Sequence, residues 1–260
     1  MVLDPASALL TDKVAVVTGA AMGIGEAVAI TFAHFGADVA ICDRDVPRLD
    51  DTANDIEATG RRVVAAELDV RGGAAAGIFL ETVRDALGPI DVLVNNAGGG
   101  FQSRLLDVSA KGQDALVHEN FTSVTNFVRG VMPLMSEAGG SIINITSIEA
   151  HRAGPGFAVY SAMKAAVANL TKSLALELGD RNIRVNCIAP DVIPTPGTGG
   201  MMSVTTPLPR AGHVDDVAGA AVYLASDTLS GFVTGTTLHV DGGNLAAGGW
   251  RRAADGTFTT

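Results

Sequence analysis

The chain has 260 residues, a length that suits one or two domains, and 18 Lys and Arg against 28 Asp and Glu give a formal net charge of −10. This balance argues against a nucleic-acid partner, because binding a phosphate backbone requires clustered cations. Hydrophobic residues make up 47% of the chain, which excludes a disordered protein. The sequence shows no secretory signal and no apolar run near the ~20 residues that span a bilayer, so we expect a cytoplasmic protein without a membrane partner.

Short apolar runs alternate with longer helical patterns along most of the sequence. The predicted strands are residues 13–18, 38–42, 62–68, 90–94, 141–146, 184–189 and 236–240, and the predicted helices are 25–35, 46–59, 74–87, 113–137, 159–178 and 214–226. The strand runs are apolar on both sides, which is typical of a parallel sheet covered by helices on both faces. We therefore predict an α/β fold, a Rossmann-like doubly wound parallel sheet of about seven strands in a single domain.

The predicted domain runs from residue 13 to 243, between an N-terminal extension (1–12) and a C-terminal tail (244–260). Residues 190–209 are rich in Pro, Gly, Ser and Thr and follow a predicted strand, which favours a substrate lid. The tail carries the only tryptophan, Trp250, and we expect it at an oligomer interface. Cys42 and Cys187 show no metal-ligand spacing and are predicted to be buried, separate thiols; no metal site is expected.

A glycine-rich turn follows the first predicted strand. Gly19, Gly23 and Gly25 would let the backbone approach a ligand closely, and the following helix would offer its N-terminal amides to a pyrophosphate. Asp43 ends the second strand, where a carboxylate accepts hydrogen bonds from the adenosine ribose of NAD and repels a 2′-phosphate. Arg44, beside it, could pair with such a phosphate but lies behind the aspartate. The pattern therefore favours NAD(H).

Several motifs occur in a fixed order along the chain: TGAAMGIG (18–25), LDV (68–70), NNAG (95–98), Asn120, Ser147 and YSAMK (160–164). In this combination the chain resembles the short-chain dehydrogenase/reductase family, from about Lys13 to Gly243. The resemblance implies an oxidoreductase that moves a hydride between a nicotinamide and a CH–OH group.

The residues themselves support this chemistry. Tyr160 and Lys164 are four apart and share one face of a helix. A nearby ammonium is expected to lower the pKa of a tyrosine from about 10, so that Tyr160 can act as acid or base on a carbonyl or alcohol oxygen. Ser147 would donate a hydrogen bond to the same oxygen and orient it.

The resemblance adds further roles. It implies that Lys164 also holds the nicotinamide ribose and that Asn120 binds a water that relays protons. Other positions are implied to contact the cofactor: Met22 and Ile24 in the glycine turn, Asp69 and Val70 at the adenine, Asn96, Ala97 and Gly98 along the inner edge, and Ile193 and Thr195 at the carboxamide. Relatives that prefer NADP often carry arginine where this chain has Met22, which again favours NAD(H).

One position departs from the family pattern. The family usually has Pro-Gly after the sixth strand, and this chain has Pro190-Asp191. If the site needs a positive φ, Asp191 would be strained, and its carboxylate would lie near the nicotinamide.

The substrate is less well marked. Met201 and Met202 in the predicted lid favour an apolar alicyclic, steroid-like or aromatic secondary alcohol, and Glu149 and His151 are candidates to contact a polar substituent. One alternative is a ketoreductase for 3-oxoacyl thioesters of acyl-carrier protein or CoA, although the stretch 131–140 lacks the basic residues expected there. A non-catalytic NAD-binding protein is less favoured, because it has no need of Ser147 with the Tyr160–Lys164 pair. Long helices with small apolar residues favour a homotetramer.

Overall fold

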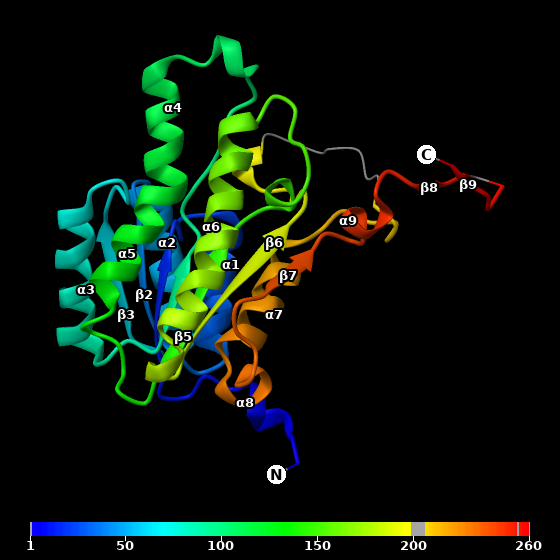
Figure 1. The fold of residues 1–260 in the computed structure, drawn as a ribbon. Coiled ribbons are helices and arrows are strands. Elements are labelled where there is room, and N and C mark those ends of the chain that lie inside the picture. Colours follow the sequence, from blue (N-terminus) through cyan, green and yellow to red (C-terminus); the bar gives the residue numbers. More distant parts are fainter. Residues whose placement is uncertain (1, 199–205, 254, 260) are drawn as a thin grey trace.

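The computed structural model describes residues 2–198, 206–253 and 255–259. Its centre is an all-parallel, seven-stranded sheet in the order β3-β2-β1-β4-β5-β6-β7 (Figure 1). The strands are β1 (Val14–Thr18), β2 (Asp38–Asp43), β3 (Val63–Glu67), β4 (Val92–Asn95), β5 (Gly140–Ile145), β6 (Ile183–Pro190) and β7 (Thr237–Val240). The predicted doubly wound parallel sheet in a single domain is therefore confirmed.

Helices cover both faces of the sheet (Figure 1). One layer holds α1 (Gly23–His34), α2 (Val46–Ala58) and α7 (Val214–Ala225), and the other holds α3 (Gly73–Leu87), α5 (Ser123–Val131) and α6 (Ala158–Glu177). Helix α4 (Ala110–Val117) extends beyond the sheet, and α8 (Asp227–Ser230) and α9 (Asn244–Ala247) are short. A two-stranded hairpin, β8 (Arg251–Arg252) with β9 (Phe258–Thr259), lies on an arm that projects from the body.

Alternation along the strands divides the hydrophobic core into two clusters. In β1, Ala15 and Val17 face the cluster that contains α1 and α7, whereas Val14 and Val16 face the cluster that contains α3 and α5. All of β1 is buried, as are the six residues of β5 and the eight of β6. Burial on both faces explains why these strands appear in the sequence as continuous apolar runs.

The predicted strands and helices agree with the structure to within two residues at their boundaries, with one exception, and the short elements α8, α9, β8 and β9 were not predicted. The predicted helix 113–137 is divided into α4, a π-helical segment (His118–Thr122) and α5. Helix α5 ends at Val131 because Pro133 follows, and proline lacks the amide that the next turn requires. π-Helical segments are frequent at functional sites, and this one contains Asn120.

The N-terminal extension packs against the body, where Leu10 is buried and Ser226 Oγ donates a hydrogen bond of 2.6 Å to the Ser7 carbonyl oxygen.

Cys42, on β2, and Cys187, on β6, are buried and form no disulfide, as predicted. Within the described part of the chain, no helix is long and apolar enough to cross a membrane.

Candidate active site

The strand order of the sheet reverses between β1 and β4: β2 and β3 follow on one side, and β5, β6 and β7 follow on the other. In a doubly wound sheet, ligands bind at the carboxyl ends of the strands where the order reverses. The glycine turn lies there. Gly19 and Gly23 have φ of +67° and +70°, and a Cβ on Gly19 would lie 2.8 Å from the Ala97 Cα. A Cβ on Gly25 would overlap the Gly19 carbonyl oxygen. The turn therefore depends on these glycines.

Asp43 lies beside this turn. Its Oδ2 accepts a hydrogen bond from the Ala21 amide at 3.1 Å, and its Oδ1 accepts from the Arg44 and Asp45 amides at 2.6 and 3.1 Å. Arg44 forms an ion pair of 3.3 Å with Glu119, which compensates its charge. The backbone thus fixes the carboxylate at the mouth of the glycine turn.

A cavity of about 400 Å³ opens over the turn. The predicted cofactor residues that line it are Gly19, Met22, Gly23, Ile24, Asp43, Arg44, Val70, Asn96, Ala97, Gly98 and Thr195. Leu68, Glu119 and Gly197 line it as well and were not predicted. Glu119 precedes Asn120 in the sequence, but nothing local indicates that it faces a ligand. Glycines in place of side chains, free helix-terminal amides and a fixed carboxylate fit a dinucleotide.

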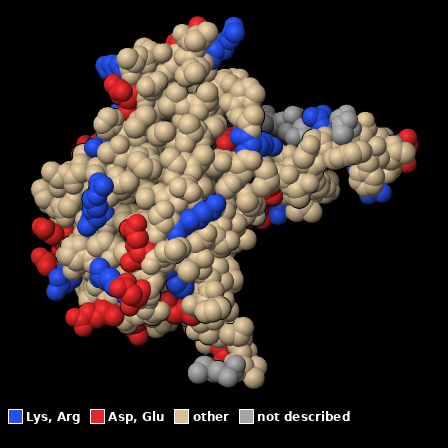
Figure 2. Space-filling model, viewed as in Figure 1, with Lys and Arg blue, Asp and Glu red and all other residues tan. Residues whose placement is uncertain are grey.

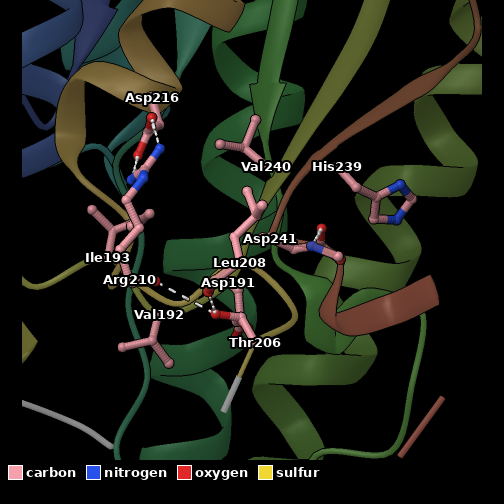
Figure 3. Close-up of a pocket in the computed structure, with 13 residues that line it drawn as sticks. Asp191, Val192, Ile193, Thr206, Leu208, Arg210, Asp216, His239, Val240 and Asp241 are labelled. Atoms are coloured by element: carbon pink, nitrogen blue, oxygen red, sulfur yellow. Dashed lines mark hydrogen bonds and ion pairs between the residues drawn. The ribbon is translucent and has the colours of Figure 1, made fainter. Parts of the chain in front are cut away.

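Apart from Tyr160 and Lys164, which belong to the catalytic group described below, three predicted cofactor residues do not line this cavity. Gly25 is packed beneath the turn. The Asp69 carboxylate is bound by the Arg71 guanidinium, at 2.9 Å between Oδ1 and Nε, and this pairing lowers the pKa of Asp69 to about 2. Ile193 is buried in the core and borders a neighbouring cavity of about 360 Å³ (Figure 3). The roles of Asp69 and Ile193 therefore stay predictions.

The four predicted catalytic residues come together at the ends of β4 and β5. Ser147 follows β5, and Tyr160 and Lys164 lie one turn apart on α6. Ser147 lies close enough to Tyr160 to influence its pKa, and Lys164 Nζ lies 5.6 Å from the centroid of the Tyr160 ring. Lys164 Nζ also donates to the Ile145 carbonyl oxygen at 2.9 Å.

Asn120 completes this group from the π-helical segment. Its Nδ2 donates to the carbonyl oxygens of Gly99 and Leu116 at 2.8 and 3.0 Å, and its Oδ1 accepts from the Gly99 amide at 3.1 Å. A Cβ on Gly98 would lie 2.8 Å from Asn120 Oδ1 and 3.1 Å from Lys164 Nζ. The two side chains therefore converge on Gly98, at the edge of the 400 Å³ cavity.

Burial controls the protonation of this group. Burial raises the pKa of Tyr160; the nearby Ser147 side chain opposes this rise, and the negative charge of Glu149 adds to it. Burial lowers the pKa of Lys164 to about 8. The expectation that Lys164 brings the tyrosine pKa below its usual value is therefore wrong for the protein by itself, because desolvation of the phenolate is the larger effect.

Asp191 does not behave as the sequence suggested. Its backbone is not strained, since Asp12 and Asn182 are the only non-glycine residues with a positive φ among those described. Its carboxylate, 8% exposed, accepts a hydrogen bond of 2.6 Å from Asn244 Nδ2 and lies 3.6 Å from Arg152 Nη2. Asn244 and Arg152 thus hold the Asp191 carboxylate. Asp191 does not line the 400 Å³ cavity.

The predicted substrate residues are placed in part. Glu149 Oε1 accepts hydrogen bonds from Arg152 Nε and Nη2, at 3.2 and 2.9 Å. His151 packs edge to face on His239, with ring centroids 4.7 Å apart; burial, then His239 and Lys172, lowers the pKa of His151. Met201 and Met202 fall outside the described residues. Arg152 was not predicted, because its link to Asp191 joins distant parts of the sequence.

The fold and this site define a dinucleotide-binding oxidoreductase, and comparison with known proteins identifies its family. A family profile described as enoyl-(acyl carrier protein) reductase matches residues 19–244. An uncharacterised oxidoreductase of Mycobacterium tuberculosis is 41% identical over 90% of this chain and 92% of its own. A 3-oxoacyl-[acyl-carrier-protein] reductase of Chlamydia muridarum is 37% identical over 91% of this chain and 99% of its own.

A solved structure shows the same relationship. A 7α-hydroxysteroid dehydrogenase complexed with NADH and 7-oxo glycochenodeoxycholic acid matches with a TM-score of 0.89 and 32% identity, over 93% of this chain and 98% of that one. The chain belongs to the short-chain dehydrogenase/reductase family. It is an oxidoreductase that acts on CH–OH groups, and its family implies a nicotinamide cofactor.

Proposed function

We propose that the protein interconverts a secondary alcohol and a ketone with NAD(H). The observation that carries this proposal is the convergence of Ser147, Tyr160 and Lys164 beside the 400 Å³ cavity. The nicotinamide supplies or accepts the hydride when it is bound. The protein's own groups must then handle one proton, on the oxygen of the substrate.

Each catalytic side chain has a distinct task in this proposal. Tyr160 gives its phenolic proton to the ketone oxygen during reduction and takes it back during oxidation. Ser147 donates a hydrogen bond to the same oxygen and orients it, from a position beside Tyr160. Lys164, which is buried, places a positive charge near the phenolate and contacts the nicotinamide ribose. Asn120 holds a water that reconnects Lys164 to solvent.

The preference for NAD(H) follows from Asp43. Its carboxylate is fixed by three backbone amides and borders the cavity, where it would accept hydrogen bonds from ribose hydroxyls and repel a 2′-phosphate. Met22 offers no cation in the turn. Arg44 and Arg48 are nearby, but they are ion-paired with Glu119 and Asp45.

The substrate class we favour is an apolar alicyclic, steroid-like or aromatic alcohol, and the 7α-hydroxysteroid dehydrogenase named above is consistent with it. The 3-oxoacyl-thioester ketoreductase remains the second candidate, supported by the relative in Chlamydia muridarum. A non-catalytic NAD-binding role is least favoured, because it would not require the Ser147–Tyr160 pair. We further propose a cytoplasmic homotetramer in which the tail 244–260 contributes to an interface.

The test measures NADH and NADPH absorbance against a panel of steroid, alicyclic and aromatic alcohols and ketones, with a 3-oxoacyl-CoA added for the second candidate. Turnover of an alcohol with NAD(H) supports the proposal. Turnover with NADP(H) alone would show that the role given to Asp43 is wrong. Light scattering on the same sample tests the assembly, and a monomer would contradict the tetramer.

A further inference from the structure

The C-terminal segment and the loop after Ser147 line a third cavity, of about 410 Å³. Its walls are Arg152 from the loop, Leu245 from α9, and Trp250 and Arg251 at the start of the projecting arm. Arg152 also holds Glu149, which acts electrostatically on Tyr160. Two side chains, Arg152 and Glu149, therefore link this cavity to the catalytic group.

The ionisable side chains at this cavity are two arginines, one of which is ion-paired. Arg152 and Arg251 are the only ionisable residues among the described residues that line it. The two carboxylates that hold Arg152, those of Glu149 and Asp191, face inward, with side chains 22% and 8% exposed, and do not line the cavity. Glu149 and Asp191 therefore compensate the charge of Arg152, and Arg251 is the cation at this cavity without a carboxylate partner among the described residues.

Both guanidinium groups have unused donors. Arg152 uses Nε and Nη2 for Glu149 and Asp191, and its Nη1 has no partner in the described part of the chain. The Arg251 guanidinium forms no hydrogen bond or ion pair with any described residue. Figure 2 shows blue Lys and Arg atoms on the arm that the C-terminal segment forms. The planar guanidinium group of arginine can donate two parallel hydrogen bonds to a carboxylate or a phosphate.

The remaining wall is apolar. Gly248 and Gly249 have φ of +58° and +99°, so they turn the chain back after α9. The Trp250 amide donates to the Ala247 carbonyl oxygen at 2.9 Å, which fixes the start of the arm and leaves the indole 56% exposed. An exposed indole beside Leu245 offers a flat apolar surface next to the two cations.

We propose that this cavity binds the anionic end of the substrate, a carboxylate or phosphate carried on an apolar body that lies against Trp250. The proposal rests on the proposed function, because it places the reacting carbinol of the same molecule at Tyr160. It narrows the substrate class from an apolar alcohol to an apolar alcohol with an acidic group remote from the carbinol. Arg251 and Arg152 are the specificity-determining residues.

The chain supplies a matched control in Arg252. Adjacent residues of a strand point to opposite faces, and Arg252 does not line the cavity. Its guanidinium lies toward the hairpin, where a Cβ on Gly256 would be 3.9 Å from Arg252 Nη2. Arg251→Gln and Arg252→Gln therefore remove the same charge from the same strand, but only the first removes it from the cavity.

Trp250 is the only tryptophan and reports on the site directly. Its fluorescence would be titrated in the full-length protein with cyclohexanecarboxylate, cyclohexyl phosphate and the neutral methyl cyclohexanecarboxylate. We expect saturable changes with the anions and a much weaker response to the ester. Arg251→Gln should raise the Kd of the anion about tenfold, because a charged hydrogen bond is lost. Arg252→Gln should change it by less than about twofold.

The outcomes separate the possibilities. Tighter binding of the carboxylate identifies an acid as the substrate end, and tighter binding of the phosphate identifies a phosphorylated or nucleotide-bearing end. Equal binding of the neutral ester, no saturable signal, or equal effects of the two arginine variants would overturn the proposal. The titration needs no turnover, so it can succeed where the alcohol panel fails, and the panel can succeed with neutral alcohols where the titration fails.

Discussion

The two ends of the candidate active site are made of different parts. The proposed cofactor end is built mainly from the glycine turn after β1 and the end of β2, and the carboxylates of Asp43 and Glu119 line it. The proposed substrate end consists of polar side chains, those of Arg152, Asp191 and Asn244, which come from three separate segments. The glycine turn at the cofactor end would be disrupted by a side chain at Gly19 or Gly25. The side chains at the substrate end can be replaced without disturbing the sheet.

The difference teaches where specificity resides. A dinucleotide is the same molecule for every enzyme that uses it, so the backbone can be shaped to it. A substrate differs from enzyme to enzyme, and loop side chains can be replaced without disturbing the core. The experiments below test whether the two ends are as independent as this comparison implies.

The largest effect is expected at the junction of the two ends. Tyr160→Phe removes the proton donor and should lower turnover about a thousandfold, within the usual range for a general acid or base. NADH binding, measured by fluorescence titration, should persist, because the ring stays in place. Tyr223→Phe, at the second tyrosine of the chain, is the control and should keep full activity. Activity of Tyr160→Phe within about tenfold of wild type would remove this residue from the proposed mechanism.

At the cofactor end, Asp43→Asn keeps the shape of the side chain and removes its charge. We expect the Kd for NAD to rise about tenfold, since charged hydrogen bonds are lost, and the preference to move toward NADP. Calorimetry with both cofactors measures this change. Asp50→Asn, which alters an exposed carboxylate on α2, should leave both affinities unchanged. An unaltered ratio of NAD to NADP affinity in Asp43→Asn would assign the discrimination to another residue.

At the substrate end, Asp191→Gly restores the usual family residue and releases Arg152 and Asn244. Loss of these contacts should cost about 1–2 kcal/mol, because hydrogen bonds to charged groups are removed. For a chain of this size the cost corresponds to a Tm lower by about 2–8 °C, measurable by calorimetry. The Kd for NADH should not change, because the carboxylate does not border the cofactor cavity. A changed NADH affinity would show that the two ends are coupled.

The smallest effect is electrostatic. Glu149 raises the pKa of Tyr160, so Glu149→Gln should lower that pKa. Alcohol oxidation needs the phenolate, so its rate rises with pH toward the tyrosine pKa, and the rising limb should move to lower pH. The pH profile of kcat/KM measures this shift. Glu177→Gln, at the exposed end of α6, is the control. If the rising limb of the profile of Glu149→Gln stays at the wild-type pH or moves to higher pH, Glu149 does not act directly on Tyr160.

Much of the cofactor end was predictable because its signals are local. Gly19, Gly23 and Gly25 lie within one turn, and Asp43 follows at the end of the next strand. Tyr160 and Lys164 are one helical turn apart, so their shared face follows from sequence spacing alone. The alternation of apolar runs with helical patterns likewise determined the seven-stranded sheet. Pro133, which ends α5, was visible in the sequence, but the predicted helix ran past it.

The tertiary structure decided what depends on distant contacts. Asp191 is unstrained and bound by Arg152 and Asn244, although the sequence suggested a strained residue at the nicotinamide. The pKa of Tyr160 is raised because burial outweighs its neighbours, and burial is a property of the folded chain. The cationic cavity joins residues about a hundred positions apart. The sequence by itself determined the fold and the family and predicted the catalytic group, since local spacing encodes them; only the fold brings Arg152 and Arg251 together, because no local pattern relates a loop after β5 to the C-terminal arm.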